Sequence, residues 1–512
     1  MKTYLKVKCT QIMTISRRLF ITLLGISLIG CTKQAHTAPY ISFSELASEG
    51  EVGSTTDPLL PPTRVPDQPL LTPTPNPPKP LPTLRTEDIY YIVQWGDTIR
   101  NIADQYDLAP EDIVETNDID DGHIYYGQQL LLPAPEISEI GPGYKMIPDS
   151  ELVNGPDTVR FQLEAFINNQ PGFLKDYRGE IDGEETSGAE IVQRVSDDYS
   201  VNPRLLLTII EYQSGWLSGH EGMDDPYPLN YRQGGYEGLY YQLAWAADEL
   251  NLGYYLWRVR GVGGWTCKDG VNVPINPTIN AGTAGLQQLF SRLLPYDKWL
   301  EAVSEVGIAA TYTDLFGYPF DFNYTPLIPV DLEQPTLQLP FEEGVPWLYT
   351  GGPHGGWDNG SAWAALDFAP AVKNLGCSFS DDWVVAVADG PIVRSDHGAV
   401  VQSIDGDPYA QTGWAILYMH IETRDRVELG AQLKAGDRIG HPSCEGGVST
   451  GSHVHIARRY NGEWIPADQD LPFVMDGWIS KGLGYAYQGL LIRGDQTIQA
   501  EETLTDFNQI QR

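Results

Sequence analysis

The C-terminal third of the chain alternates apolar and polar residues in short runs that Gly, Asp and Pro separate. From about residue 335 these runs have the length and β-branched content of strands, and they cover residues 383–390, 391–396, 399–405, 414–422 and 453–460. Side chains two positions apart lie on one face of a strand, so His453 and His455 should project together while Val454 enters a core. The pattern predicts an antiparallel β-sheet domain over residues 335–490, followed by a tail over 491–512.

The middle of the chain, residues 150–325, has the longer apolar periodicity of helices. The segment 191–216 is predicted as helix, with Asn202 as an N-cap and Pro203 at a first helical position. Further helices are expected over 236–250 and 281–305. We therefore predict a mainly α-helical domain.

Residues 87–135 indicate a small separate domain. Tyr91 and Val93 alternate as on a half-buried strand, Gly96 gives a turn, and Asp97 or Thr98 can cap a helix. A second short helix over 110–116 and a closing strand in GQQLLLP, 127–133, complete a βααβ unit.

This unit resembles the LysM module over residues 88–134. The resemblance lies in YxV, GDT, the adjacent Ile and Ala of the first helix, Asn117 and GQxLxxP. It implies binding of N-acetylglucosamine in peptidoglycan or chitin, in a shallow groove. A generic βααβ domain is the alternative.

The N-terminus has the pattern of a secretory signal. Five cations and no acid precede a short apolar run, LFITLLGISLI, which is shorter than the about 20 residues that span a bilayer. The tetrad LIGC resembles the bacterial lipobox, which implies cleavage after residue 30 and lipidation of Cys31. An ordinary cleaved signal is the alternative. Residues 31–86 are too rich in proline for helix or central strand, which predicts a semi-rigid linker that acts as a tether.

The formal net charge is −35 among 512 residues, which argues against a nucleic-acid partner because phosphates would be repelled. A secretory signal places the chain outside the cytosol, where cysteines can form disulfides. Beyond Cys9 and Cys31 the chain has three cysteines, so one thiol remains if two of them pair.

Six of the nine histidines fall between residues 354 and 455. Clustered imidazoles with a nearby carboxylate suit zinc, which takes four tetrahedral ligands and keeps one position open for water at hydrolytic sites. A single HxH pair is weak evidence, because two histidines on a strand are often only a polar face.

The surrounding residues carry a stronger signal. GGPHGGWDNGSAWAALDFAP, the YMH at 418–420 and GSHVH at 451–455 resemble the lysostaphin-type (LytM) zinc endopeptidases, most closely their beta-lytic branch. The resemblance implies one Zn²⁺ bound by His354, Asp367 and His455. It also implies a catalytic pair, His420 and His453.

Roles within that pair follow from the chemistry of imidazole near neutral pH. We expect His453 to be the general base and His420 to stabilise the oxyanion. His420 is expected on the strand face that also carries Tyr418, which would then line the same groove. His397 and His441 have no place in the pattern and are expected at the surface.

Cys377 and Cys444 both lie in the zinc domain, and Cys444 shortly precedes the HxH strand. A disulfide between them would brace the wall of the groove. Two buried free thiols are the alternative.

The middle region contains two segments similar to lytic transglycosylases, LLLTIIEYQSGW with Glu211 and INAGTAGLQQLF. That similarity makes a lysozyme-like domain one option, with Glu211 as a second catalytic acid. The residue after Glu211 is tyrosine, where that family has serine, and an exposed glutamate on a scaffold helix is the alternative.

The sequence thus predicts a peptidoglycan hydrolase of the cell envelope, lipid-anchored or secreted, in which LysM holds the glycan and the zinc domain cuts stem or cross-bridge peptides. Two other readings stay open: a non-catalytic regulator of other wall hydrolases, and an additional glycan-cleaving activity at Glu211.

Overall fold

The structure is a computed structural model that describes residues 73–512 except 107, 120–121, 372–375, 504 and 506. The expected signal peptide, Cys31 and the linker up to residue 72 lie outside the described residues. Within the described part of the chain, no helix combines the length and the apolar character needed to cross a bilayer. Residues 87–133 form one compact unit, and residues 73–86 with 134–512 belong to a second.

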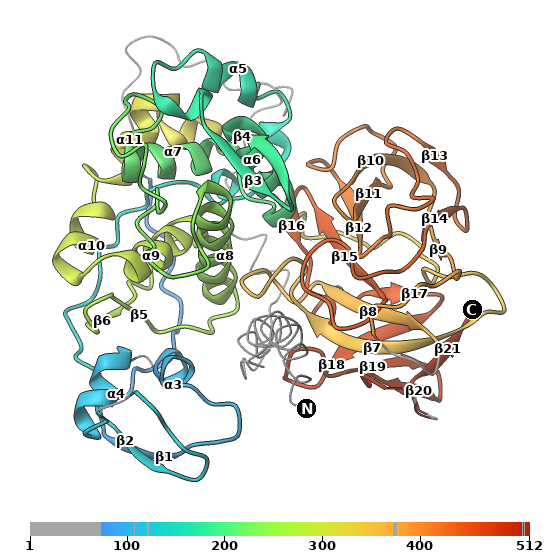
Figure 1. The fold of residues 1–512 in the computed structure, drawn as a ribbon, viewed down its shortest axis with the longest axis horizontal. Helices are drawn as coiled ribbons and strands as arrows, with labels where there is room; N and C mark the ends of the chain where they lie inside the picture. Colours follow the sequence, from blue (N-terminus) through green and yellow to red (C-terminus); the bar gives the residue numbers. More distant parts are fainter. Residues whose placement is uncertain (1–72, 107, 120–121, 372–375, 504, 506) are drawn as a thin grey trace, which may run out of the picture. The chain divides into compact units, whose positions relative to one another are not determined.

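The first unit is the expected βααβ domain, drawn in blue in Figure 1. It consists of β1 (Ile89–Ile92), α3 (Ile99–Gln105), α4 (Pro110–Thr116) and β2 (Gln129–Leu132), with β1 and β2 paired antiparallel. Thr98 caps α3 by accepting from the Asn101 N–H, as the sequence predicts. Its core contains Val93, Ile102 and Ala103 among other apolar residues.

The motif residues of this unit hold its turns in place. The Asn117 side chain accepts from the Leu131 N–H at 2.7 Å and donates to the carbonyls of Ile113 and Leu131, so it ties α4 to β2. Tyr91 Oη donates to Asp97 Oδ2 at 2.7 Å, which fixes the turn after β1. The motif residues Tyr91, Asp97 and Asn117 therefore stabilise the fold of this unit.

The described end of the proline-rich linker forms neither helix nor strand, as expected. It is not a free tether, however. The N–H groups of Asn76 and Lys79 donate to the carbonyls of Thr278 and Pro277, so this segment runs along the helical region.

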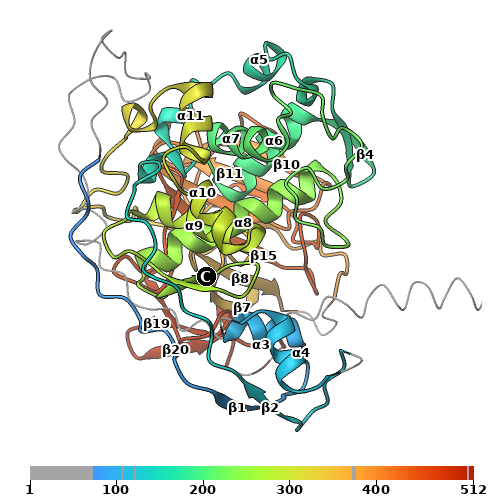
Figure 2. The ribbon, with the colours of Figure 1, turned by 90° about the vertical axis from the view of Figure 1, so that its left-hand side faces the viewer.

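The helical region contains seven α-helices among the described residues: α5 (Leu163–Asn168), α6 (Gly188–Tyr199), α7 (Pro203–Ser214), α8 (Leu239–Arg258), α9 (Ala281–Leu293), α10 (Tyr296–Ala302) and α11 (Ile308–Phe316). Figure 2 shows α8 and α9 side by side. The region also contains two small hairpins. One pairs β3 (Arg178–Ile181) with β4 (Glu184–Ser187) before α6, and the other pairs β5 (Gly264–Thr266) with β6 (Asn272–Pro274) between α8 and α9.

The helix predicted over 191–216 is two helices. Ser200 adopts a left-handed backbone conformation (φ 55°), which ends α6, and Asn202 then caps α7 by accepting from the Arg204 N–H. Pro203 occupies the first helical position, where its missing N–H costs nothing.

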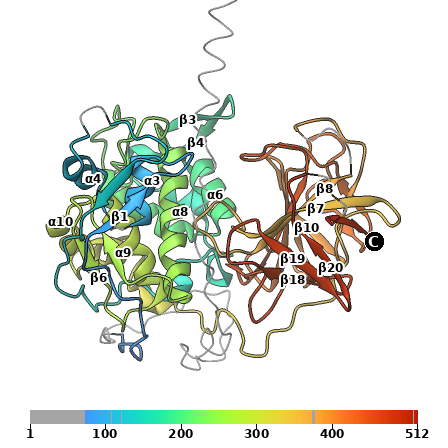
Figure 3. The same ribbon diagram turned by 90° about the horizontal axis from the view of Figure 1, so that it is seen from below.

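The C-terminal region is built on a nine-stranded antiparallel sheet with the order β13 (Gln432–Leu433), β10 (Gly390–Asp396), β11 (Ala399–Ser403), β12 (Trp414–Met419), β15 (Val454–Tyr460), β8 (Ala365–Pro370), β7 (Pro346–His354) and β21 (Gln509–Gln511), and β16 (Glu463–Trp464) pairs with β15. A four-stranded sheet, β17 (Val474–Met475), β18 (Trp478–Gly482), β19 (Gly489–Arg493) and β20 (Gln496–Gln499), contributes to the same region (Figure 3). A short pair joins β9 (Val384–Val385) to β14 (Arg438–Gly440).

Residues 491–512 are not a tail. The end of β19 and all of β20 belong to the four-stranded sheet, and β21 pairs with β7 along the edge of the large sheet. Ile510 is 2% exposed. The strand β21 in particular has no local signal, because its pairing partner β7 lies more than 150 residues away in sequence.

Strand alternation divides the large sheet between two cores. Ile416 and Tyr418 on β12 join Ile456 in a core shared with the four-stranded sheet. The intervening Leu417 and Met419 face the other side and belong to a core continuous with the helical region. The site described next lies on this second face, because His455 pairs directly with Met419.

Candidate metal centre and its histidines

Three adjacent strands bring the predicted ligands together. Asp367 on β8 lies opposite His455 on β15, and His354 on β7 lies opposite Ala365 on β8. Gly351 faces Asp367 across β7 and β8, and a Cβ there would overlap the Asp367 carboxylate. The glycine therefore leaves room for the acid.

The side chains converge on one point. His354 Nε2 lies 3.0 Å from His455 Nδ1, and each of these nitrogens lies 3.3 Å from Asp367 Oδ1. All three side chains are buried.

Backbone carbonyls orient both imidazoles. His354 Nδ1 lies 2.8 Å from the Gly352 carbonyl oxygen, and His455 Nε2 lies 3.0 Å from that of Gly356. A carbonyl oxygen only accepts, so these two nitrogens carry the protons. In the neutral imidazoles the opposite nitrogens then direct lone pairs at each other and at Asp367. A metal-binding histidine commonly donates its other ring N–H to a backbone carbonyl in this way.

The donor set fits a divalent metal. Asp367 Oδ1 is buried without a hydrogen-bond donor, and it faces two imidazole lone pairs. Three electron-rich atoms at this spacing need a cation between them. Two imidazole nitrogens and one carboxylate are ligands that zinc prefers, with the fourth position left for water.

His453 and His420 stand beside this set. His453 Nε2 lies 3.6 Å from Asp367 Oδ1, so both histidines of the HxH pair reach the same carboxylate, and Val454 is fully buried on the other face. The face predicted for each of these three residues is confirmed. The rings of His420 and His453 are 4.4 Å apart between centroids.

Each of these two histidines is also tied through Nδ1. His453 Nδ1 lies 2.8 Å from the Gly451 carbonyl oxygen, and His420 Nδ1 lies 2.9 Å from that of Glu445. In the neutral form of each imidazole the proton is therefore on Nδ1 and Nε2 holds a lone pair.

Tyr418 does not line the groove, which corrects the expectation from strand alternation. Strand β12 ends at Met419, and His420 adopts a left-handed conformation (φ 65°). The turn swings the imidazole to the metal side, while Tyr418 stays fully buried in the opposite core and donates to Gln402.

Burial and neighbouring side chains shift the pKa values of three residues of the site. Burial lowers the pKa of His420 to about 3, helped by the neighbouring His453 and His455. Burial opposes ionisation of Asp367, but the adjacent imidazoles of His354 and His453 outweigh it and hold the pKa of that carboxyl well below its usual range. Burial lowers the pKa of His455 as well, so its imidazole is neutral, as a metal ligand must be.

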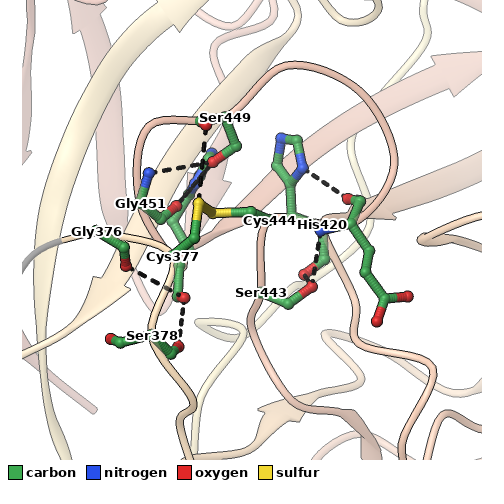
Figure 4. Close-up of a disulfide and its surroundings, with 11 residues drawn as sticks. Gly376, Cys377, Ser378, His420, Ser443, Cys444, Ser449 and Gly451 are labelled. Atoms are coloured by element: carbon green, nitrogen blue, oxygen red, sulfur yellow. Dashed lines mark hydrogen bonds between the residues drawn. A yellow bond between two sulfur atoms is a disulfide. The ribbon is translucent and has the colours of Figure 1, made fainter. Parts of the chain in front are cut away.

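A disulfide joins Cys377 to Cys444, with a Cα–Cα distance of 5.6 Å (Figure 4). It joins Cys377, which follows Gly376, to Cys444, which follows Ser443. Ser443 donates its N–H to the His420 carbonyl oxygen at 2.7 Å, and the Ser452 N–H donates to Gly376. The bridge is therefore flanked by Ser443, which bonds His420, and by Gly376, which bonds the residue before His453.

His441 is buried, not at the surface as expected. Its ring packs 3.9 Å from that of Trp383 between centroids, and Nδ1 bonds the Asp382 carbonyl oxygen. His397 does lie at the exposed turn between β10 and β11, beside Asp396.

Glu211 lies in the last turn of α7. Its carboxylate accepts from the N–H groups of Leu217 and Ser218 at 2.9 and 3.2 Å and from the Ser218 hydroxyl. A carboxylate with three donors closes the turn after the helix, which is a structural use of this residue.

Two features carried no recognisable signal in the sequence. Tyr487, in the turn between β18 and β19, stacks on His354 with ring centroids 4.2 Å apart. On the LysM unit, four aromatic side chains are largely exposed: Tyr90, Trp95, Tyr125 and Tyr126. Exposed rings of this kind can stack on sugar faces.

Comparison with known proteins follows this division of the chain. The model described as "LasA, N-terminal domain" matches residues 145–329, the region expected to be mainly helical, and the LysM domain model matches residues 91–133. Protease LasA of Pseudomonas aeruginosa is 25% identical over 335 residues, which are 62% of this chain and 74% of that protein. The beta-lytic metalloendopeptidase of Achromobacter lyticus is 29% identical over 136 residues, 25% of this chain and 34% of that protein.

Among solved structures, the M23 metalloprotease pseudoalterin from the deep sea is 22% identical, with a TM-score of 0.29, over 35% of this chain and 99% of that one. The catalytic domain of lysostaphin from Staphylococcus simulans is 26% identical, with a TM-score of 0.17, over 23% of this chain and 86% of that one. The chain is a metalloendopeptidase that carries a LysM domain and a LasA-like N-terminal domain, and its sequence is similar to Protease LasA and to beta-lytic metalloendopeptidase.

Proposed function

We propose that this chain is a zinc-dependent endopeptidase of the cell envelope that cuts stem or cross-bridge peptides of peptidoglycan. The observation that carries the proposal is the convergence of His354 Nε2, His455 Nδ1 and Asp367 Oδ1, with the remaining nitrogen of each imidazole held by a carbonyl. Such a set would hold one Zn²⁺ and leave a position open for water.

When bound, zinc supplies Lewis-acid polarisation of the scissile carbonyl and a more acidic attacking water. His453 is placed to take the proton of that water, because its Nδ1–H is committed to Gly451 and its Nε2 lone pair faces the ligand set. An imidazole at that position can later return the proton to the leaving amine.

His420 is assigned to the developing oxyanion. Its Nδ1–H is committed to Glu445, so Nε2 can donate only after it takes up a proton. Burial and the neighbouring histidines oppose that uptake in the resting site, so His420 becomes a donor only when negative charge develops beside it.

The LysM unit would hold the enzyme on the glycan. Its exposed Tyr90, Trp95, Tyr125 and Tyr126 offer stacking surfaces for N-acetylglucosamine. LysM binding and peptide cleavage would then act on the same polymer. We favour this reading over a non-catalytic regulator, because no ligand or catalytic histidine is missing.

A lytic transglycosylase activity at Glu211 finds no further support. The donors from Leu217 and Ser218 occupy its carboxylate and close the turn after α7, so these contacts explain the residue without a catalytic role.

The test is mass spectrometry of fragments released from purified peptidoglycan. New free amines are expected, and an excess of chelator should abolish them until zinc is restored. Full cleavage in excess chelator, or reducing or anhydro sugar ends as the main products, would contradict the proposal.

We also propose that lipidated Cys31 anchors the mature protein, on the basis of the LIGC tetrad. Wild-type protein should fractionate with membranes, and Cys31→Ser should be unprocessed or released. An unmodified N-terminus on protein found wholly in the medium would exclude the anchor.

A further inference from the structure

The loop between two of the ligands, residues 355–364, holds the third. The Gly356 carbonyl oxygen accepts from His455 Nε2 at 3.0 Å, which sets the tautomer and the ring orientation of that ligand. The loop is tied to itself as well. The Gly356 N–H donates to Ala362 at 3.0 Å, and the Trp357 N–H donates to Ser361 Oγ at 3.0 Å. Any shift of one end of this loop therefore moves the Gly356 carbonyl.

The far side of the same loop is fixed by the helical region. Asp248, on α8, accepts from the Gly360 N–H at 2.7 Å. The contact is close, because a Cβ on Gly360 would overlap the Asp248 backbone. Tyr199, at the end of α6, donates its hydroxyl to Asp358 at 3.2 Å.

Gly356 also contacts Trp464. The indole of Trp464 packs so closely on Gly356 that a Cβ there would overlap the ring. That indole donates to the Tyr199 carbonyl at 3.3 Å, and the Trp464 N–H donates to the Tyr255 hydroxyl at 3.0 Å. Two residues of the helical region thus hold the residue that supports Gly356.

We propose that the helical region positions the zinc ligand His455, and that Asp248 is the positioning residue that does so through Gly360 and Gly356. The inference rests on the proposed zinc site. The helical region then helps to orient the ligands of the metal centre. Loss of its hydrogen bond to the loop at Gly360 weakens metal binding although no ligand is changed. Loss of an outer partner of a metal-bound histidine typically costs about 10–100-fold in metal affinity.

The test measures zinc affinity in the full-length protein by competition with a chromophoric chelator. Asp248→Ala removes the acceptor for Gly360, and its dissociation constant for zinc should rise about 10–100-fold. Asp248→Asn keeps an acceptor oxygen and should restore most of the affinity. Glu249→Ala is the matched control, because Glu249 is the next residue on α8 and bonds Gln288 within the helical region.

The outcomes separate the two proposals. A wild-type protein that binds no zinc contradicts the proposed function itself. Zinc binding by Asp248→Ala that equals that of wild type and Glu249→Ala overturns only the positioning role. If Asp248→Ala does not fold, Tyr199→Phe removes the hydroxyl that donates to Asp358 of the same loop, and it should raise the dissociation constant severalfold. An unchanged constant for that variant overturns the inference.

Discussion

His453→Ala is expected to keep zinc and lose turnover, because His453 is not one of the three converging ligands. Its Nε2 is 3.6 Å from Asp367 Oδ1, and its other nitrogen bonds Gly451. The carbonyls that orient His354 and His455 belong to Gly352 and Gly356, so the substitution leaves them in place. A positioned proton-transfer group contributes about 10²–10⁴-fold to the rate. That loss corresponds to about 3–5.5 kcal/mol of transition-state stabilisation.

The assay pairs metal content with peptide cleavage for three variants. His453→Ala should retain wild-type zinc stoichiometry and KM, with kcat reduced about 10²–10⁴-fold. His455→Ala removes a ligand and should lose both zinc and cleavage. Glu211→Gln is the control in the helical region and should leave peptide cleavage unchanged. Full turnover in His453→Ala, or loss of its zinc, would refute the division between ligands and catalytic pair.

Three further outcomes are expected. Replacing Cys377 and Cys444 together by Ser should lower kcat while zinc content stays constant, because the bridge supports the carbonyls that hold His420 and His453 and not those that hold the ligands; simultaneous loss of zinc would contradict this. Cys267 is 2% exposed and burial raises its thiol pKa to about 12, so native protein at pH 8 should resist alkylation that succeeds after denaturation, as peptide mapping would record. Trp95→Ala should weaken pull-down by purified peptidoglycan by about 1 kcal/mol, roughly fivefold, without changing cleavage of a soluble peptide.

Strand alternation and helix-capping residues, which are local features of the sequence, determine much of the fold. The period-two alternation of 453–460 follows from strand geometry, so it correctly placed Val454 in the core and His455 on the opposite face, where it pairs with Asp367. Capping by Thr98 and Asn202 depends on a few neighbouring residues and was also predictable. The predicted ligand set, with its family resemblance, brought together three residues that the sheet register places on adjacent strands.

Long-range contacts decided the rest. A left-handed backbone at His420 sends its ring to the side opposite Tyr418, and no alternation rule contains that turn. His441 is buried because Trp383 happens to fold onto it, and β21 is a strand because β7 offers an edge. The hydrogen bond from Gly360 to Asp248 joins residues 112 positions apart, so no local pattern indicates that α8 contacts the loop after His354. Strand period and helix capping are set within a few residues of chain, whereas burial, edge pairing and loop support depend on which distant surfaces the folded chain presses together.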